Sequence, residues 1–369
     1  MQSEVLDLFC ELAAVTSPSG EEREVADRVT RYLRDCGLAV DEDGAGAQVG
    51  WTAGNLYARL EPTAAGEPLF LCAHLDTVPL TDTVEPVVDA GTVRNAKPTI
   101  LGSDNKAAVA AMLEATRRVL AEGRPHAGLE LVFTPQEEVG LFGAYAFDHT
   151  RLQATLGYVY DQAAPIGEVV LGAPSAHELA ITFHGRAAHA GMCPEEGRSA
   201  IAAAARAIAE MPLGRIDDDS TANVGLVSGG TAANIVPEWC SLAAEARSHD
   251  ERKLAEIVRS LQDAVTFAAG VAECEVETTV QRSYRAYRFR RDDRAVRLAA
   301  DALSRCGYDP RFALSGGGAD ANVFNERGLH CVNLANGMAE IHTPDEHIAV
   351  ADLEAMVEVT LALVDAAVA

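Results

Sequence analysis

Acidic and imidazole side chains stand directly after apolar runs of this sequence, where they could bind a metal ion or move a proton. The run "LELVF" is followed by "TPQEEVG", which sets Glu137 and Glu138 side by side. An unpaired charge next to a buried strand costs free energy, so these carboxylates must be solvated, paired or bound to a cation. Because the turn after a strand can aim both side chains at one place, the pair raises the question of what each carboxylate does.

Four further residues occupy comparable positions. His74 closes "LFLCAHLD", Asp104 follows the glycine of "ILGSD", Asp161 closes "LGYVYD" and His342 follows the loop after "HCVNLAN". Each of these residues taken alone has an ordinary explanation, such as a helix N-cap for Asp104 or a turn for Asp161. Together they form a mixed set of imidazole and carboxylate groups, and such sets suit zinc, manganese or cobalt.

The surrounding pattern predicts a sheet that would bring these residues together. Apolar runs at "NLYARLE", "PLFLCAHLDT", "LELVFTP" and "LGYVYDQ" predict strands, and the alanine-rich "DNKAAVAAMLEATRRVLAEG" predicts a long helix. Two more helices are expected within residues 3–36, on either side of "TSPSG". Strands alternating with helices indicate an α/β sheet that is covered on both faces. Ligands bind beyond the carboxyl ends of the strands in such sheets, so we expect the six side chains to share one crevice.

The pattern changes between residues 175 and 284. The expected elements there are, in order, a strand at "HELAITFHG", a helix at "SAIAAAARAIAEM", strands at "NVGLVSGG" and "CSLAAEARS", a helix at "ERKLAEIVRSLQDAVTFAAG" and a strand at "ECEVETTVQRSY". This βαββαβ order is that of a ferredoxin-like unit.

After residue 285 the α/β pattern returns, with a helix at "RAVRLAADALSRCG", a glycine-rich loop at "SGGGADAN", a strand at "HCVNLAN" and a helix from about residue 348. We therefore predict a doubly wound mixed-sheet domain formed by residues 1–174 and 285–369. A smaller α/β sandwich formed by residues 175–284 would be inserted into it, as a lid or dimerisation domain.

Composition restricts the possible functions. A chain of 369 residues is long enough for two domains. Its formal net charge of -25 argues against binding to nucleic acid or to an anionic membrane surface. The eight cysteines form no CxxC pair, and their positions in apolar segments predict buried, reduced thiols. The N-terminal segment is acidic where a signal peptide would be basic, and no apolar run is long enough to span a bilayer, so we predict a cytoplasmic protein.

Seven blocks of the sequence resemble, in order, the signature blocks of the dinuclear metallopeptidase family that includes peptidase T, the glutamate carboxypeptidases and the aminoacylases. They are "LCAHLDTVP", "LGSDNKAAVAAMLEA", "TPQEEVGLFGA", "YVYDQAAP", "HGRAAHAGMCPEEGRSAI", "GGTAANIVP" and "IHTPDEHI". The resemblance covers nearly the whole chain and points to the peptidase T-like branch.

The resemblance implies a site for two divalent metal ions, zinc in the first place and cobalt or manganese as alternatives. His74 and Asp161 would hold one ion, Glu138 and His342 would hold the other, and Asp104 would bridge the two. Two zinc ions about 3.5–4 Å apart would then share a water or hydroxide.

The resemblance also assigns catalytic roles. Glu137 would stay off the metals and carry a proton from the water to the leaving amine, a transfer that contributes roughly 10²–10⁴-fold. Asp76 would orient a ligand imidazole. His189, in the inserted domain, would reach the active site of a partner subunit and stabilise the oxyanion, which implies a homodimer through that domain. Asn234 and Arg247 would bind the backbone or a terminal carboxylate of the substrate, although a surface ion pair is the alternative for Arg247.

The implied activity is hydrolysis of amide bonds in short peptides, by an aminopeptidase or tripeptidase. One departure bears on this: peptidase T carries an arginine just before a shorter Gly-Gly-Thr-Asp loop, where this chain has Ser315 and glycines. The alternatives on the same scaffold are an N-acyl-amino-acid amidohydrolase and a carboxypeptidase-type hydrolase. A non-catalytic binding protein is a third alternative, which the complete set of metal and acid–base residues disfavours.

Overall fold

The computed structural model describes residues 3–369, without the side chains of residues 48 and 49. The chain forms two compact units. The first contains the chain up to Gly172 together with Arg288–Ser315 and Ala319–Ala369, and the second contains Ala173–Tyr287 together with Gly316–Gly318. Part of the glycine-rich loop thus groups with the second unit, where the Gly318 amide donates a hydrogen bond to the Tyr284 hydroxyl at 3.1 Å.

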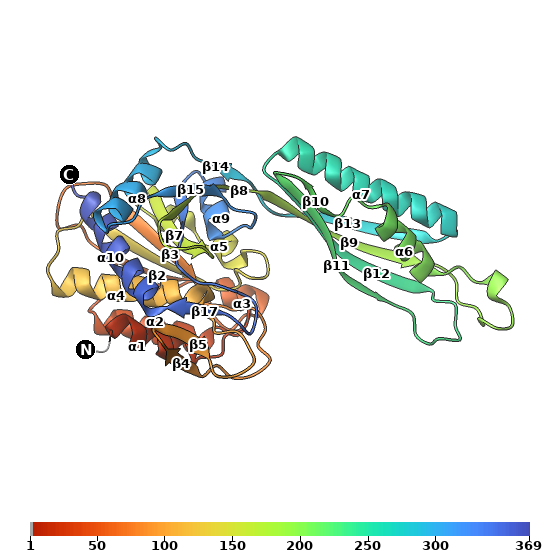
Figure 1. Ribbon diagram of the computed structural model, residues 1–369, viewed down its shortest axis with the longest axis horizontal. Coiled ribbons are helices and arrows are strands. Elements are labelled where there is room, and N and C mark those ends of the chain that lie inside the picture. Colours follow the sequence, from red (N-terminus) through yellow and green to blue (C-terminus); the bar gives the residue numbers. More distant parts are fainter. Residues whose placement is uncertain (1–2) are drawn as a thin grey trace. The chain divides into compact units, whose positions relative to one another are not determined.

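A nine-stranded mixed sheet forms the centre of the first unit (Figure 1). Its strands lie in the order β1-β2-β6-β3-β7-β16-β8-β14, and β15 pairs with β8. The central strands are β6 (Leu129–Thr134), β3 (Leu69–His74), β7 (Leu156–Gln162) and β16 (His330–Ala335). β3 runs parallel to both β6 and β7, and β16 runs parallel to β7. Every residue of β3 and β6 is buried, as expected for strands that are covered on both faces.

The remaining strands of the first unit are shorter. They are β1 (Val40–Glu42), β2 (Leu56–Leu60), β8 (Glu168–Ala173), β14 (Tyr287–Arg288) and β15 (Arg311–Leu314) in the large sheet, and β4 (Pro86–Asp89), β5 (Thr92–Asn95) and β17 (His347–Ala349) in a separate small sheet. Of these, only β2 was predicted from the sequence. The doubly wound mixed sheet itself is confirmed.

Helices cover this sheet. They are α1 (Glu4–Ala13), α2 (Arg23–Asp35), α3 (Ala45–Val49), α4 (Ser103–Ala121), α5 (Phe142–Ala146), α8 (Arg294–Arg305), α9 (Asp320–Glu326) and α10 (Val350–Ala366), with a 3-10 turn at His149–Arg151. α4 contacts β3 and β7 and is buried from Ser103 to Thr116, which explains its alanine-rich sequence. Two residues near its start, Asp104 and Asn105, have non-helical dihedral angles, and the peptide bond between them is cis.

The second unit is the predicted ferredoxin-like sandwich with one additional strand. Its five-stranded antiparallel sheet has the order β10-β11-β12-β9-β13, and its strands are β9 (Ser175–His184), β10 (Gly214–Asp217), β11 (Ser220–Gly229), β12 (Trp239–Ser248) and β13 (Glu275–Tyr284). The helices α6 (Ala200–Glu210) and α7 (Glu251–Ala272) pack on one face of this sheet (Figure 1). The core between them consists mainly of alanine, leucine, isoleucine and valine side chains. A short 3-10 turn at Pro194–Glu196 precedes α6.

Two further expectations concern the whole chain. Within residues 3–369, no helix combines the length and the hydropathy needed to cross a bilayer. All eight cysteines are free, but only Cys72, Cys240 and Cys331 are buried. The expectation of buried thiols is therefore wrong for the other five, which are partly exposed. Cys10 lies within α1, Cys36 and Cys306 directly follow helices, and Cys193 and Cys274 lie in loops.

Candidate metal centre

The ends of three adjacent strands define the candidate site. β6, β3 and β7 are neighbours and run parallel, so they end at the same edge of the sheet. His74 is the last residue of β3, Asp161 is the last but one of β7, and the turn after β6 carries Glu137 and Glu138. The topology thus places residues from three distant parts of the sequence at the carboxyl ends of the strands, where α/β sheets bind ligands.

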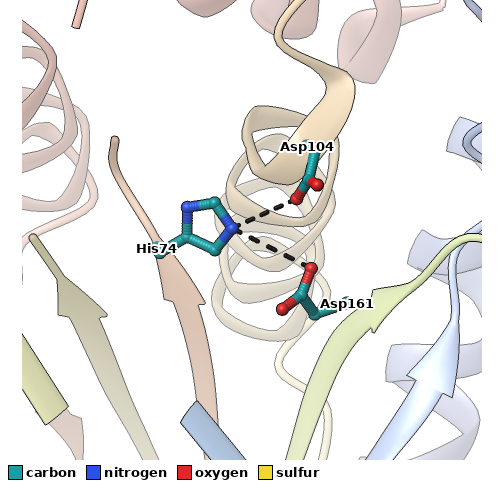
Figure 2. Close-up of side chains that lie close together, drawn as sticks. All are labelled: His74, Asp104 and Asp161. Carbon is teal, nitrogen blue, oxygen red and sulfur yellow. Dashed lines mark hydrogen bonds and ion pairs between the residues drawn. The ribbon is translucent and has the colours of Figure 1, made fainter. Parts of the chain in front are cut away.

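The first group of candidate ligands is His74, Asp104 and Asp161, shown in Figure 2 pointing toward one another. The Nε2 atom of His74 lies 3.1 Å from Oδ1 of Asp104 and 3.9 Å from Oδ1 of Asp161. The His74 side chain is only 2% exposed, so its imidazole is held in place by its surroundings. One imidazole and two carboxylates from three elements thus converge on one point.

The second group is Asp104, Glu138 and His342. Nε2 of His342 lies 3.3 Å from Oδ2 of Asp104 and 3.2 Å from Oε1 of Glu138. The two groups therefore share Asp104, whose two oxygen atoms face different histidines. A third grouping, His74 with Glu137 and Glu138, places a carboxylate oxygen of Glu137 within 4.8 Å of ligand atoms of His74 and Glu138.

The electrostatics of this cluster are those of carboxylates crowded together. Burial and the Asp104 charge raise the pKa of Asp161 to about 8. Burial likewise raises the pKa of Glu137 well above its ordinary value, with Asp161 adding to the shift, and it raises the pKa of Glu138. Hydrogen bonds to Asp104 and Glu138 raise the pKa of His342 to about 10. Asp104 differs, because its hydrogen bonds to His342 and His74 outweigh burial and lower its pKa. The other three carboxylates resist ionising in this setting, so the cluster needs more positive charge than the histidines supply.

This donor set fits two divalent cations. Each of the two ligand groups offers one imidazole nitrogen and carboxylate oxygens within 4.8 Å of one another, and Asp104 can serve both. Mixed nitrogen and oxygen ligands are those that zinc, cobalt and manganese accept. A cation would also offset the repulsion that raises the carboxylate pKa values. The residues present can therefore hold a pair of metal ions.

Asp76 lies next to this site. Besides its predicted role of orienting a ligand imidazole, it contacts the turn that carries Glu137 and Glu138. The Nδ1 atom of His74 lies 2.9 Å from the backbone carbonyl oxygen of Asp76, but 3.5 Å from its carboxylate. The carboxylate instead accepts hydrogen bonds from the backbone amides of Glu137, at 3.0 Å, and Glu138, at 3.2 Å. Asp76 therefore orients the imidazole mainly through its backbone, while its side chain holds the turn that bears both glutamates.

Glu346 and Asn105 were missed from the sequence. The buried carboxylate of Glu346 accepts hydrogen bonds from the backbone amides of Leu101, Gly102 and Asp104 and from the Ser103 hydroxyl, and so fixes the segment that carries Asp104. The Asn105 side-chain amide donates to Oδ1 of Asp161 at 2.9 Å. Both residues lie in the quoted blocks "IHTPDEHI" and "LGSDNKAAVAAMLEA". Their position in these blocks was the only sequence feature that could have identified them, because their distance along the chain from the candidate ligands has no predictive value.

Asp320 was also missed. It lies in the stretch "SGGGADAN", which was predicted to be a loop but forms the start of α9. The Thr134 hydroxyl donates to its carboxylate at 2.5 Å, and burial raises the pKa of Asp320 to about 6. Ser315 donates its backbone amide to the Gly172 carbonyl at 2.9 Å. The glycine-rich stretch therefore leads into a helix that supplies a buried carboxylate below the end of β6.

The three remaining predicted residues lie in the second unit. His189 and Asn234 belong to adjoining segments: His189 forms an antiparallel bridge with Ile235, and the Ala190 amide donates to the Asn234 carbonyl at 3.0 Å. Both residues are exposed. Arg247, on β12, pairs with Glu245 at 2.8 Å. The structure thus brings His189 close to Asn234, and it places Arg247 in the ion pair that was considered as its alternative role.

Comparison with known proteins adds the family. The sequence model of peptidase family M20/M25/M40 matches residues 70–366. The chain is 36% identical to the uncharacterized protein YqjE of Bacillus subtilis, over 99% of both chains.

Two solved structures resemble the whole chain. An aminopeptidase PepT from Bacillus cereus is 37% identical, with a TM-score of 0.87 over 100% of this chain and 99% of that one. A tripeptidase from Staphylococcus aureus is 34% identical, with a TM-score of 0.92 over 98% of this chain and 97% of that one. The similarity therefore includes both the sheet that carries the candidate metal centre and the inserted sandwich.

Proposed function

Because the chain belongs to peptidase family M20/M25/M40, we propose that its metal centre cleaves the first amide bond of short peptides that carry a free N-terminal amine. The observation that carries this proposal is the pair of ligand groups that share Asp104, with the buried Glu137 beside them. The similarity to an aminopeptidase and to a tripeptidase supports peptides as the substrate class.

The proposed metals are two zinc ions, with cobalt or manganese as alternatives. His74 and Asp161 would hold one ion, Glu138 and His342 the other, and Asp104 both. When bound, such ions would polarise the scissile carbonyl and acidify water. The ligand chemistry supports zinc, since imidazole and carboxylate are its usual ligands at catalytic sites.

Glu137 is the proposed general base and acid. Its carboxylate is close to the ligand groups, and burial raises its pKa toward the range in which a base works at neutral pH. It would take a proton from the attacking water and deliver that proton to the leaving amine nitrogen. Asp76 supports this transfer by holding the Glu137 amide at 3.0 Å, which fixes the direction of the side chain.

The second unit supplies the proposed oxyanion and substrate contacts. His189 would donate a hydrogen bond to the developing oxyanion, and Asn234 would bind the substrate backbone. Arg247 would bind a substrate carboxylate after exchanging its partner Glu245, a change that keeps the arginine paired. The exposure of His189 and Asn234 supports a role toward a molecule outside their own unit.

A homodimer through the second unit is part of the proposal. Of the sixteen large hydrophobic side chains that are exposed among the described residues, ten belong to this unit, including Leu226, Val227 and Trp239. β11 pairs with β10 only as far as Ala222, so within the described chain its outer edge is open from Asn223 to Gly229. An open edge with exposed apolar side chains can be covered by a second copy, and the twofold dimer is the commonest closed assembly.

A cytoplasmic location completes the proposal. The free state of all eight cysteines supports a reducing compartment. The net charge of -25 supports a protein that binds neither nucleic acid nor anionic membranes.

The test is a substrate panel with the zinc- or cobalt-loaded protein. Di- and tripeptides with free amines are expected to be cut faster than their N-acetylated forms, because the acidic site attracts the amine. N-acetyl amino acids and C-terminal glutamate conjugates belong in the same panel. Turnover of N-acetyl amino acids without turnover of free peptides would replace the aminopeptidase by the amidohydrolase alternative.

A further inference from the structure

The segment Val15–Glu22, here called the N-terminal brace, lies against the loop that carries Asp76. Pro18 forms a parallel bridge with Thr77, the Thr77 amide donates to the Ser17 carbonyl at 2.9 Å, and the Ser19 amide donates to the Thr77 carbonyl at 3.3 Å. The Ser17 hydroxyl donates to the Leu75 carbonyl at 2.9 Å. The brace therefore follows residues 75–77 like a short additional strand, directly behind the ligand His74.

The brace also reaches other parts of the site. The Lys106 ammonium, fully buried at the start of α4, donates to the Val15 carbonyl at 2.5 Å. Glu22, also fully buried, accepts a hydrogen bond from the Gly20 amide at 2.6 Å. Burial raises the pKa of Glu22, although hydrogen bonds from the backbone, including that of Gln136, act in the opposite direction. One segment thus touches the loops that carry His74, Asp104 and the two glutamates.

The contact that bears on chemistry is the one to Asp76. Its side chain is fully buried and accepts the successive amides of Glu137 and Glu138, one on each oxygen. Gln136, just before them, has a φ of 55°, a left-handed conformation that turns the chain so that both amides can face one anion. Because such a turn is held by its contacts, the orientation of the Asp76 carboxylate sets the direction of both glutamate side chains.

We propose that Ser19 is a positioning residue of the active site, because its hydroxyl fixes the carboxylate of Asp76 on the Glu137–Glu138 turn. The Ser19 hydroxyl donates to Oδ2 of Asp76 at 2.6 Å, the shortest of the three hydrogen bonds that this carboxylate accepts from Ser19, Glu137 and Glu138. Without it, Asp76 can rotate toward Nδ1 of His74, which lies 3.5 Å from Oδ1, and release one of the two amides.

A purely structural role for Ser19 is the competing explanation. Ser19 lies shortly before α2, where serine is a common helix cap, but the N-cap residue of α2 is Glu22 and no side chain caps this helix. The Ser19 hydroxyl instead donates its hydrogen bond to Asp76. Ser17 offers a matched control, because it lies in the same brace and its hydroxyl binds only a backbone carbonyl.

The experiment compares Ser19→Ala, Ser19→Thr and Ser17→Ala, each loaded with cobalt. In Ser19→Ala, kcat for a tripeptide is expected to fall by about 10–100-fold, the usual effect of a lost supporting hydrogen bond at a metal site, with KM changed by less than about threefold. Ser19→Thr, which keeps the hydroxyl, should restore kcat to within about threefold. Ser17→Ala should lower Tm but leave kcat near that of the wild type.

A double-mutant cycle with Asp76→Asn tests the route of the effect. If Ser19 acts through Asp76, Ser19→Ala adds little to the loss already caused by Asp76→Asn. If the loss of kcat in the double variant equals the product of the two single losses, the two residues act independently and the proposal is overturned. A Ser19→Ala variant with wild-type kcat would also overturn the proposal. The same holds if Ser19→Ala and Ser17→Ala lose kcat equally and in proportion to their loss of Tm.

This inference rests on the proposed function for its kinetic readout, so a second readout is independent of turnover. Cobalt binding, followed by the visible absorption of the ion, is expected to weaken by about 10–100-fold in Ser19→Ala and to stay unchanged in Ser17→Ala. If the wild type cleaves no peptide but the two variants still differ in cobalt binding, the proposed function fails and the role of Ser19 stands. Equal cobalt binding in both variants would refute that role.

Discussion

Glu137 and Glu138 are adjacent in the sequence, yet their surroundings in the structure differ. Glu138 lies 3.2 Å from His342 and belongs to the second ligand group with Asp104. Glu137 is held by its amide on Asp76, and burial and Asp161 raise its pKa. Because the pKa values of Asp161 and Glu138 are raised as well, the proposed division of roles rests on geometry: Glu138 contacts His342, whereas Glu137 belongs to neither of the two groups that share Asp104.

We therefore expect Glu137→Ala to keep both metal ions and to lose turnover by about 10²–10⁴-fold, the contribution of a general base. Glu138→Ala is the matched comparison and should lose one equivalent of metal. Metal analysis of the purified variants decides the assignment. Loss of a metal equivalent from Glu137→Ala, with full occupancy in Glu138→Ala, would show that the two roles are exchanged.

Residues at the ends of strands or just after them could be found from the sequence, whereas residues that act from other loops, apart from His342, could not. His74 and Asp161 follow apolar runs, and a run of this kind marks where a strand ends. Glu346 and Ser19 lie in loops. The path of a loop depends on the rest of the folded molecule and leaves no periodic pattern in the sequence from which it could be predicted. Asp76 was noticed, but the partner of its carboxylate depends on the left-handed turn at Gln136, which sequence does not predict.

At the scale of elements, the contact between β3 and β7 sets the spacing of His74 and Asp161. Gly157 on β7 lies against the ring of Phe70 on β3, and a methyl group at Gly157 would lie 2.1 Å from that ring. The fully buried Phe70 has no room to move. The absence of a side chain at Gly157 thus allows these two strands to pair at their normal distance.

Gly157→Ala is accordingly expected to lower the free energy of unfolding by about 1–3 kcal/mol or more, as overpacking of a core does. It should also weaken metal binding, because it displaces one ligand strand from the other. Gly270→Ala is the control, since no atom lies within 4 Å of the added methyl in α7, and it should stabilise by about 0.5–1 kcal/mol. Urea denaturation measures both, and equal stability of the two variants would contradict the argument.

Long elements with a single strong pattern were predictable. α4 is rich in alanine and fully buried over most of its length, and β3 and β6 are uninterrupted apolar runs. β10, β15 and the small sheet of β4, β5 and β17 were missed, because strands of three or four partly exposed residues carry no clear alternation. α9 was missed because glycines precede it and its seven residues form only about two turns, too few for a clear helical pattern.

At the scale of the whole molecule, the predicted dimer can be tested by subunit exchange. His189→Ala and Glu137→Ala chains are each expected to be inactive, since one would lack the proposed oxyanion contact and the other the proposed base. If the His189 of one subunit serves the metal centre of the other, a mixed dimer contains one intact site. Mixing, followed by dissociation and reassembly, should then restore about a quarter of the wild-type activity per chain, by the statistics of a twofold dimer.

Light scattering supplies the companion measurement. A dimer is expected, and substitution of the exposed Leu226 and Val227 by aspartate should yield monomers with strongly reduced turnover. A loss of activity of about 10²–10³-fold together with the loss of the dimer would be in line with an intersubunit site, because one oxyanion donor contributes about 2.7–4 kcal/mol. A fully active monomer would refute the dimer requirement.

The order of the strands in the large sheet determines when, during synthesis of the chain, the candidate metal centre can form. β16 lies between β7 and β8, although it follows the whole second unit along the chain, and His342 comes after it. Ribosomes add about 5–20 residues per second, so on the order of ten seconds or more separate the synthesis of Asp161 from that of His342. During that time the second unit can fold, while the sheet of the first still has a gap at its centre. If Glu138 and His342 hold the second metal ion as proposed, its loading would be a late event for the nascent chain, and activity would not arise before β16 has filled the gap.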